Sequence, residues 1–592
     1  MSTWFARRVL DLVGKLTDAY YRRKYGALAQ RLGRPGIPPD DLTAEPSSPP
    51  TPGLILIQVD GLSHHHLVQA IAAGFMPHVG RLLAEGRLEV ANWRCGLPSS
   101  TPAVQAGLMF GNRFDIPGYR WYEKDRETVV TPQHLDEIRS LSDRISDGRQ
   151  GILRGGSCYV SMFDGDADLA LFTLSAFRRQ RFFESIRGIG LFILFLLSPL
   201  RVVRVVGRTV TNYLSGVARR LVGLLRPSIL NPLDVFSPLL QGFSDALFTE
   251  VQTFGVQLDI YRCMPAIYTN FTGYDEVAHK LGPDHPAAFR VLHGVDKRIR
   301  QINRMRGRYR QREYDLYLLS DHGNTPAVPF SWQNGSTLGE HLVAEIGKGL
   351  SLYEPVETHT HLRKRARYLC EELQALGEQS SPGFRRMLAA AQRHIRQRMR
   401  HGQPLDYDLK RQRDVVVSPS GPLAHIYFNV TRRPLDLIEV MLLYPDLVDH
   451  LSTKPGIGAV IGRADVHTIV LGQHGGTLEI GDEQTVLEEP NPLAPFDDVD
   501  YASDQVHRLA HFPHAGDLIV LGEVQSDGKV ITFEQQLATH GGMGGPQGHP
   551  FIAWPPGRSL AAEALNDPEA LYPYFMRRYQ AMPTQDRHSQ RP

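Results

Sequence analysis

The chain has 592 residues, of which 42% are hydrophobic and 22% are charged. This composition excludes a disordered chain, a collagen, a coiled coil and a polytopic membrane protein, and the length predicts roughly four domains at about 150 residues each. Lysine and arginine total 65 against 63 acidic residues, so a net charge of +2 gives no support for binding to a nucleic acid duplex.

Two segments precede the predicted globular part. Residues 1–30 carry apolar side chains at helical spacing among basic residues, which predicts an amphipathic helix. Residues 31–53 are rich in proline and predict an extended linker. Charged residues at positions 7, 8, 11 and 15 interrupt any apolar core that a signal peptide needs. The four cysteines lie far apart, so we expect free thiols in a cytoplasmic protein without a signal peptide.

Short apolar runs that alternate with helical patterns predict the main domain. The run at residues 54–59 is typical of a strand buried on both faces of a parallel sheet. Similar runs follow at residues 266–269, 315–320, 426–430, 469–471, 517–521 and 551–554, and helical patterns occupy residues 76–85, 286–306 and 361–376. This alternation predicts an α/β fold with a doubly wound, mostly parallel sheet.

One stretch departs from the balanced charge, because residues 185–233 carry seven arginines and no acidic residue. Its first apolar run, residues 188–200, is shorter than the roughly 20 residues of a spanning helix, and Pro199 is expected to bend the chain. Beyond it, apolar side chains from Val203 to Leu224 recur at helical spacing. We predict a basic apolar helical hairpin that makes the protein peripheral or monotopic at an anionic membrane surface. Packing on the protein's own core and an oligomer interface are the alternatives.

Residues 414–462 predict a strand, a helix at residues 435–451 and a second strand, which together form a smaller α+β lobe. The predicted catalytic domain therefore has three parts, residues 54–184, 234–335 and 511–592, the last with a C-terminal tail. The hairpin at residues 185–233 and a helical linker with the lobe at residues 336–510 interrupt it.

Polar motifs stand at the ends of several predicted strands. Asp60 directly follows the first strand, where open α/β sheets bind ligands, although Asp-Gly is also a turn dipeptide. Asp321 and His322 follow the strand at residues 315–320, and two polar groups beside a core strand need partners. Asp275 and His279 are four residues apart, which places both on one face of a helix where they can share a metal.

Two further motifs complete the set. Thr101 ends the run Leu-Pro-Ser-Ser-Thr before small and apolar residues, a pattern that also suits a helix N-cap. His540 lies in Thr-His-Gly-Gly, whose glycines permit close approach of a ligand. His474, in a second His-Gly-Gly, competes for the same role.

The order of these motifs resembles the alkaline phosphatase superfamily, and most of all its type I phosphodiesterase/nucleotide pyrophosphatase branch. The resemblance covers roughly residues 54–556 with gaps, and it implies a two-metal hydrolase of phosphate esters. Carried onto matching positions, it implies one metal on Asp275, His279 and His540, and another on Asp60, Asp321, His322 and the hydroxyl of Thr101. The distance from Thr101 to Gly111 matches the family's nucleophile-to-glycine spacing, which favours Thr101 over Ser99 and Ser100.

These residue types suit a two-metal site, because imidazole and carboxylate groups are ligands for divalent ions such as Zn²⁺. Mn²⁺ accepts the same groups. We expect hydrolysis through a covalent phospho-threonine at Thr101, on a membrane-associated or lipid phosphate substrate. The alternatives are a soluble nucleotide pyrophosphatase or phosphodiesterase, and a catalytically silent membrane-associated scaffold of the same fold. Pro102 follows Thr101 where many nucleotide pyrophosphatases have Phe-Pro-Asn, which leaves the nucleotide preference open.

Overall fold

The structure is a computed structural model, and it describes residues 52–131, 135–176, 199–222, 236–308, 312–347, 350–355, 414–481 and 485–580. The predicted N-terminal helix and nearly all of the linker lie outside the described residues. So do the helix expected at residues 361–376 and the first arm of the hairpin up to residue 198.

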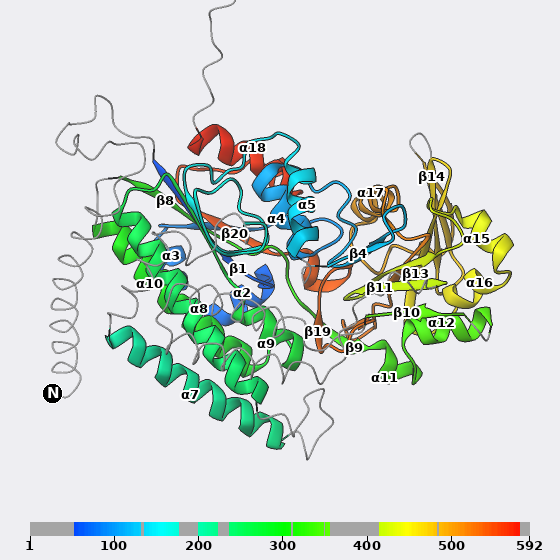
Figure 1. The fold of residues 1–592 in the computed structure, drawn as a ribbon, viewed down its shortest axis with the longest axis horizontal. Coiled ribbons are helices and arrows are strands. Elements are labelled where there is room, and N and C mark those ends of the chain that lie inside the picture. The colour runs from blue at the N-terminus through cyan, green and yellow to red at the C-terminus, as the bar shows by residue number, and fades with distance from the viewer. Residues whose placement is uncertain are drawn as a thin grey trace, which may run out of the picture.

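The main sheet confirms the predicted α/β fold. It has seven strands, in the order β2 (Glu89–Asn92), β20 (Phe551–Trp554), β8 (Tyr314–Leu319), β1 (Gly53–Val59), β7 (Ala266–Phe271), β5 (Ser157–Ser161) and β6 (Leu169–Thr173). β20 runs antiparallel to both of its neighbours, and the other pairs are parallel. β1 lies at the centre of this mostly parallel sheet, in blue in Figure 1.

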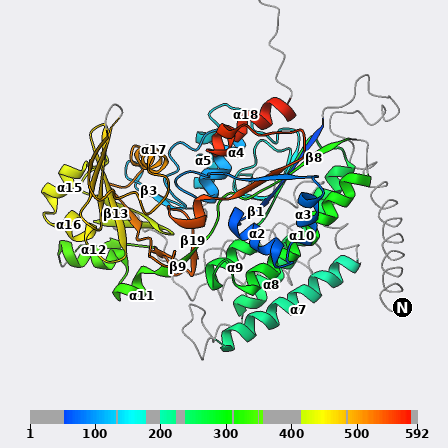
Figure 2. The same ribbon diagram turned by 180° about the vertical axis from the view of Figure 1, so that it is seen from behind.

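Helices cover both faces of the main sheet, because successive side chains of a strand point to opposite faces. Ile55 and Ile57 of β1 belong to one buried cluster and Leu54 and Leu56 to another. The first cluster includes residues of α2 (His64–Ala72), α3 (Pro77–Ala84), α8 (Phe236–Tyr261), α9 (Gly273–Leu281) and α10 (Pro286–Arg308). The second includes residues of α4 (Thr101–Phe110), α5 (Leu135–Ser146) and α18 (Pro568–Tyr579), so the sheet is doubly wound (Figures 1 and 2).

A second sheet of eight strands forms the lobe, which is larger than predicted. Its order is β10 (Leu352–Tyr353), β11 (Val415–Ser420), β12 (Leu423–Phe428), β17 (Leu518–Gly522), β13 (Ile457–Ala464), β14 (His467–Gly472), β15 (Thr477–Ile480) and β16 (Thr485–Glu488). Its pairs are antiparallel apart from β10 with β11. α12 (Leu338–Ile346) and α17 (Val499–Ala510) pack on it in separate apolar clusters.

The lobe corrects two expectations. The run at residues 517–521, expected in the third part of the catalytic domain, belongs to this second sheet, because a buried strand has the same apolar pattern in either sheet. The runs at residues 426–430 and 469–471 lie in it as well, within the segment predicted for the lobe. The single helix expected at residues 435–451 is two short helices, α15 (Leu437–Leu443) and α16 (Leu447–Ser452). Pro445 lies between them and cannot continue the hydrogen bonds of a helix.

The arm of the predicted hairpin that the structure describes is α7 (Pro199–Val222), a helix that packs along α8 on the outside of the molecule (Figures 1 and 2). The helix begins at Pro199, where a bend was expected, because proline suits the first helical position. Val205 packs in the core, whereas Val203, Val206, Val210 and Leu214 are exposed by 68%, 56%, 50% and 60%. The described residues do not establish a hairpin with the first arm.

Among the described residues, no single helix is long and apolar enough to cross a membrane. Taken together, α2 and α3 have the length and apolar composition of a membrane span, but the two helices are bent by 99° relative to each other.

A small three-stranded sheet joins the two large ones. It contains β18 (Val530–Thr532), β9 (Thr325–Pro329) and β19 (Ala538–Thr539), and β9 follows β8 closely in the chain. The turn between β11 and β12 packs against the residues that follow β19. A Cβ atom added to Gly421 would lie 1.9 Å from the His540 carbonyl oxygen, and one added to Gly541 would lie 2.2 Å from that of Ser420. Both glycines have positive φ angles, so this close approach requires them.

The remaining elements are short. β3 (Trp121–Glu123) and β4 (Thr128–Val130) form a hairpin, α11 (Phe330–Asn334) follows β9, and 3₁₀ turns lie at Gly545–Gly548 and Ala562–Leu565.

His425 of β12 joins the lobe to the main domain, and its environment predicts that the protein is less stable at acidic pH. Its Nδ1 accepts the N–H of Gly516 at 3.0 Å and its Nε2 donates to the Pro117 carbonyl at 2.8 Å, which uses the neutral ring. Burial lowers its pKa from 6.5 to about 4. The unfolded chain therefore binds more protons between these values, and stability falls as the pH drops below about 6.5. We expect a loss of about 2 kcal/mol from this group between pH 7 and pH 5, measured by urea unfolding.

The matched variant is His425→Gln, which has no titratable ring. Its free energy of unfolding should fall less steeply over the same pH range. Equal slopes for both proteins would show that His425 does not titrate in this way.

Candidate active site

The seven residues singled out from the sequence converge at one edge of the main sheet. The carboxyl ends of parallel strands meet there, as is usual for ligand sites in open α/β sheets. The residues come from the ends of β1 and β8, from α9 after β7, from the first turn of α4 and from the residue after β19: Asp60, Asp321, His322, Asp275, His279, Thr101 and His540.

The first group lies beside Thr101. One ligand atom from each of Asp60, Asp321 and His322 lies within 4.8 Å of the other two. His322 Nε2 lies 3.6 Å from Asp60 Oδ1 and 3.5 Å from Asp321 Oδ2. The hydroxyl Oγ1 of Thr101 is 3.2 Å from the same Nε2 atom. Together these atoms bring a hydroxyl next to a buried set of oxygen and nitrogen donors.

The second group adjoins the first. Asp275, His322 and His540 also have ligand atoms within 4.8 Å of one another, and His279 Nε2 lies 3.2 Å from Asp275 Oδ2. The rings of His322 and His540 stack with centroids 3.6 Å apart. His322, which the family resemblance implies for one metal only, therefore lies between the two groups.

Backbone carbonyl groups orient all three imidazoles in the same way. The Nδ1 atoms of His279, His322 and His540 donate to the carbonyl oxygens of Ala538, Gly323 and Ser99 at 2.7, 2.9 and 3.0 Å. Each ring therefore presents Nε2 to the cluster. Metal-ligating histidines characteristically donate their other nitrogen to such a partner, which fixes the tautomer and the ring orientation.

The electrostatics of the cluster also favour bound cations. Burial, together with Asp321 and Asp275, raises the pKa of Asp60 well above its usual value, and burial raises that of Asp321. Burial opposes ionisation of Asp275 as well, but His279, with His540 and His322, holds its pKa well below the usual range. Asp321 Oδ2 is buried without a hydrogen-bond partner among the described residues. Divalent cations would neutralise these carboxylates and satisfy that oxygen, so the donor set fits them.

The structure separates the three hydroxyls of the Ser-Ser-Thr run. Ser99 and Ser100 are fully buried, and the Ser99 hydroxyl donates to the Gly542 carbonyl at 2.7 Å. Thr101 is only half-buried and directs Oγ1 at His322. Of these three hydroxyls, that of Thr101 is the one that faces the cluster.

Three further histidines lie outside the cluster. His474 is exposed in the turn between β14 and β15 of the second sheet. His66 lies 2.6 Å from Ser63 Oγ and 3.0 Å from Asp284 Oδ1, which gives it a structural role at the start of α2. His549 pairs with Asp497 at 3.3 Å.

The aromatic residues that flank Thr101 in the sequence are mainly core residues. Trp93, Trp121 and Tyr122 are buried, and Tyr119 is half-buried.

Two asparagines at the site were not predicted from the sequence. Asn270 Nδ2 donates to Asp60 Oδ2 at 2.7 Å, and Asn324 Nδ2 donates to Asp275 Oδ1 at 2.9 Å. Each lies in or beside a buried strand, where an amide needs partners. That polar interruption is the signal by which the sequence could have identified them.

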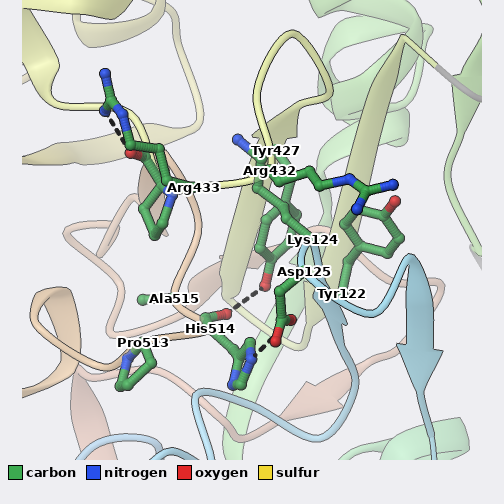
Figure 3. A pocket seen from close by; sticks show the side chains of 10 residues that line it. Tyr122, Lys124, Asp125, Tyr427, Arg432, Arg433, Pro513, His514 and Ala515 are labelled. Carbon is green, nitrogen blue, oxygen red and sulfur yellow. Dashed lines mark hydrogen bonds and ion pairs between the residues drawn. The ribbon is translucent and has the colours of Figure 1, made fainter.

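A separate cavity of about 420 Å³ lies where the loop after β3 meets the second sheet (Figure 3). Its charged side chains are already paired: Lys124 with Asp517 at 3.0 Å, Asp125 with His514 at 3.1 Å and Arg432 with Glu127 at 3.2 Å. The lining residues are Tyr122, Lys124, Asp125, Tyr427, Arg432, Arg433, Pro434, Pro513, His514 and Ala515.

Beside this cavity, Glu123, Asp125 and His514 also bring possible ligand atoms within 4.8 Å of one another. Arg126 and Arg144, however, bond the two oxygens of Glu123 at 2.7 and 3.0 Å. This group is an ion-pair network, and we place no metal there.

The α/β fold and the buried cluster at its strand ends fit a metal-dependent hydrolase of phosphate esters as the class of protein. The comparison with family models agrees: residues 243–420 match type I phosphodiesterase / nucleotide pyrophosphatase. This match confirms the resemblance that the motifs predicted, and with it the expectation of an enzyme that hydrolyses phosphate esters. No curated protein matches the chain significantly.

Several solved structures are similar to the chain along most of its length. Phosphonoacetate hydrolase from Sinorhizobium meliloti 1021 in complex with phosphonoacetate is 14% identical, with 89% of this chain and 96% of that chain covered and a TM-score of 0.43. Murine ectonucleotide pyrophosphatase/phosphodiesterase 5 is 12% identical, with 90% and 96% covered and a TM-score of 0.39. The order and direction of the strands in the main sheet establish the fold class.

Metal removal should destabilise the protein, because a ligand that binds only the folded state stabilises it. After chelation, we expect Zn²⁺ or Mn²⁺ to raise the thermal midpoint, with about 2.7 kcal/mol of stabilisation at 100 times the Kd. Asp321→Asn, which removes a charged donor, should reduce this shift in differential scanning fluorimetry. His474→Ala, far from the cluster, should respond as the wild type does; a chelated wild type that is indifferent to both metals contradicts the metal site.

Proposed function

We propose that the protein hydrolyses phosphate esters through a covalent phospho-threonine at Thr101, with two divalent cations, Zn²⁺ in the first instance, in the cluster. The observation that carries this proposal is the half-buried Thr101 hydroxyl, 3.2 Å from His322 Nε2 in a buried set of carboxylates and imidazoles. Asp60, Asp321 and His322 would hold one cation beside Thr101. Asp275, His279 and His540 would hold the other, with His322 between the two positions.

The cations, when bound, would lower the pKa of the Thr101 hydroxyl and neutralise charge on the phosphoryl oxygens. Thr101 Oγ1 attacks phosphorus, the ester P–O bond breaks, and the alcohol leaves with its electron pair and a proton. Water then attacks the phosphorylated threonine and restores the hydroxyl, which releases phosphate from a monoester substrate and a phosphate monoester from a diester. Thr101 is the first residue of α4, so the positive end of the helix dipole also favours the phosphoryl group.

The proposed substrate is a membrane-associated or lipid phosphate ester, with the protein held peripherally at the cytoplasmic face. α7 supports this proposal, because four of its apolar side chains are exposed along one side. Its sequence contains five arginines and no acidic residue, which suits an anionic lipid surface. A soluble nucleotide is the alternative substrate, in keeping with the name of the matched family. The complete set of donors argues against a catalytically silent scaffold.

Replacing the nucleophile tests the mechanism. Thr101→Ala should reduce hydrolysis of a phosphodiester such as bis(p-nitrophenyl) phosphate at least about 10³-fold, because no other hydroxyl of the run faces the cluster. Ser100→Ala is the matched control, since the Ser100 Oγ is buried without a hydrogen-bond partner among the described residues. Mass spectrometry of the acid-quenched wild type should detect a p-nitrophenyl phosphoryl group on Thr101. Unchanged turnover in metal-loaded Thr101→Ala would refute the covalent mechanism.

Removing the exposed stripe of α7 tests the membrane proposal. The triple variant Val206→Ser, Val210→Ser and Leu214→Ser should lower binding to phosphatidylserine vesicles more than about tenfold in a flotation assay. Each apolar side chain that the bilayer buries contributes about 1.5 kcal/mol or more. The control is Val466→Ser, another exposed valine, in the second sheet. A wild-type protein that stays with the soluble fraction at low salt would contradict membrane binding.

A further inference from the structure

Asn324 joins three separate segments of the site. It is fully buried and follows Asp321 and His322 in the loop between β8 and β9. Its Nδ2 atom donates one N–H to the Gly61 carbonyl at 3.0 Å and the other to Asp275 Oδ1 at 2.9 Å. A single side chain from the β8 loop thereby holds the residue after Asp60 and a carboxylate of α9.

The contacts around Gly61 leave no room for a side chain at this position. A Cβ atom added there would lie 2.4 Å from both Asn324 Nδ2 and Asp275 Oδ1, and the φ angle of +72° also favours glycine. The Gly61 N–H donates to Asp321 Oδ1 at 3.3 Å. The segment that follows Asp60 is therefore held on both sides by residues of the same β8 loop.

The amide chemistry explains why an asparagine occupies this position. Both acceptors of Asn324 are oxygens, so a donor group must face them, and an aspartate would repel them. Its bond to Asp275 Oδ1 leaves Oδ2 of that carboxylate facing His279 at 3.2 Å. Asn324 Oδ1 is buried with no hydrogen-bond partner among the described residues, so the two N–H bonds alone set the orientation of the amide.

We propose that Asn324 is a positioning residue that couples the two metal positions. It fixes Asp275, which belongs to one position, against the Asp60 and Asp321 segments, which belong to the other. This inference rests on the proposed function. Asn270 offers a comparison within the site, because its amide donates to Asp60 and so touches a ligand of one position only.

The test measures metal binding directly. Asn324→Leu keeps the size and branching of the side chain and removes both donors. In chelator-competition titrations with Zn²⁺ alone, we expect affinity at both positions to fall about 10- to 100-fold, the usual effect of losing such a partner. Asn270→Leu should weaken one position only. Asn303→Leu is the matched control, because Asn303 is a buried amide that bonds His78 and also has an unpartnered Oδ1.

Cobalt(II) absorption spectra give a second readout, because their intensity reports coordination number and a general loss of stability does not alter it. We expect the Asn324→Leu spectrum to differ from the wild type and that of Asn303→Leu to match it. If Asn324→Leu does not fold, Asn324→Ser, which is smaller and keeps a single donor, is measured in the same way and should bind Zn²⁺ at least tenfold more weakly.

The outcomes separate this inference from the proposed function. Wild-type affinity at both positions in folded Asn324→Leu, or weakening at one position only, would overturn the coupling role and leave the proposed function intact. A wild type that binds no Zn²⁺ would overturn both. Weakening at both positions beside an unaffected Asn303→Leu supports the coupling role.

Discussion

The structure depends on the burial of three carboxylates at one end of a parallel sheet. Asp60, Asp275 and Asp321 are almost fully enclosed, and each loses the hydration that normally stabilises its charge. Imidazoles and asparagine amides compensate for part of this loss, and the opposite pKa shifts of Asp60 and Asp275 show that the compensation is uneven. Bound cations would complete it. The free-energy cost of burying these carboxylates is the condition for a preorganised electrostatic field at the site, which can stabilise the charge of a phosphoryl group.

The site belongs to the whole fold and not to one motif. Each histidine of the cluster is oriented by a carbonyl group, and for His279 and His540 that carbonyl lies on a distant segment, at Ala538 and Ser99. The segments therefore fix one another, so ligand geometry and tertiary packing are one and the same constraint. This arrangement is typical of preorganised metal centres, in which the outer partners decide how well the donors bind.

The sequence predicts the parts of this molecule that are local. Apolar periodicity predicts β1, β8 and α10. Asp60, Asp321, His322, Asp275 and His279 are recognisable because they follow a strand or share a helix face, and Thr101 and His540 through the motifs around them. Asn324 has only the local signal of a polar residue beside a strand, and its role could not be predicted because its partners lie 49 and 263 residues away and only the fold brings them together. The strand at residues 517–521 was found but assigned to the catalytic domain and not to the lobe, since burial leaves the same apolar pattern in either sheet. Pro445 was the local signal that the expected long helix is divided.

The close approach of Gly421 to His540 links the lobe mechanically to the catalytic cluster. The turn of the lobe rests on the backbone of a site residue with no space for a methyl group between them. A shift of this turn towards the main domain would push on the His540 backbone, whose ring is held by the Ser99 carbonyl and stacks on His322. A side chain at position 421 would therefore act on the catalytic cluster through the backbone of His540, although the residue itself belongs to the lobe.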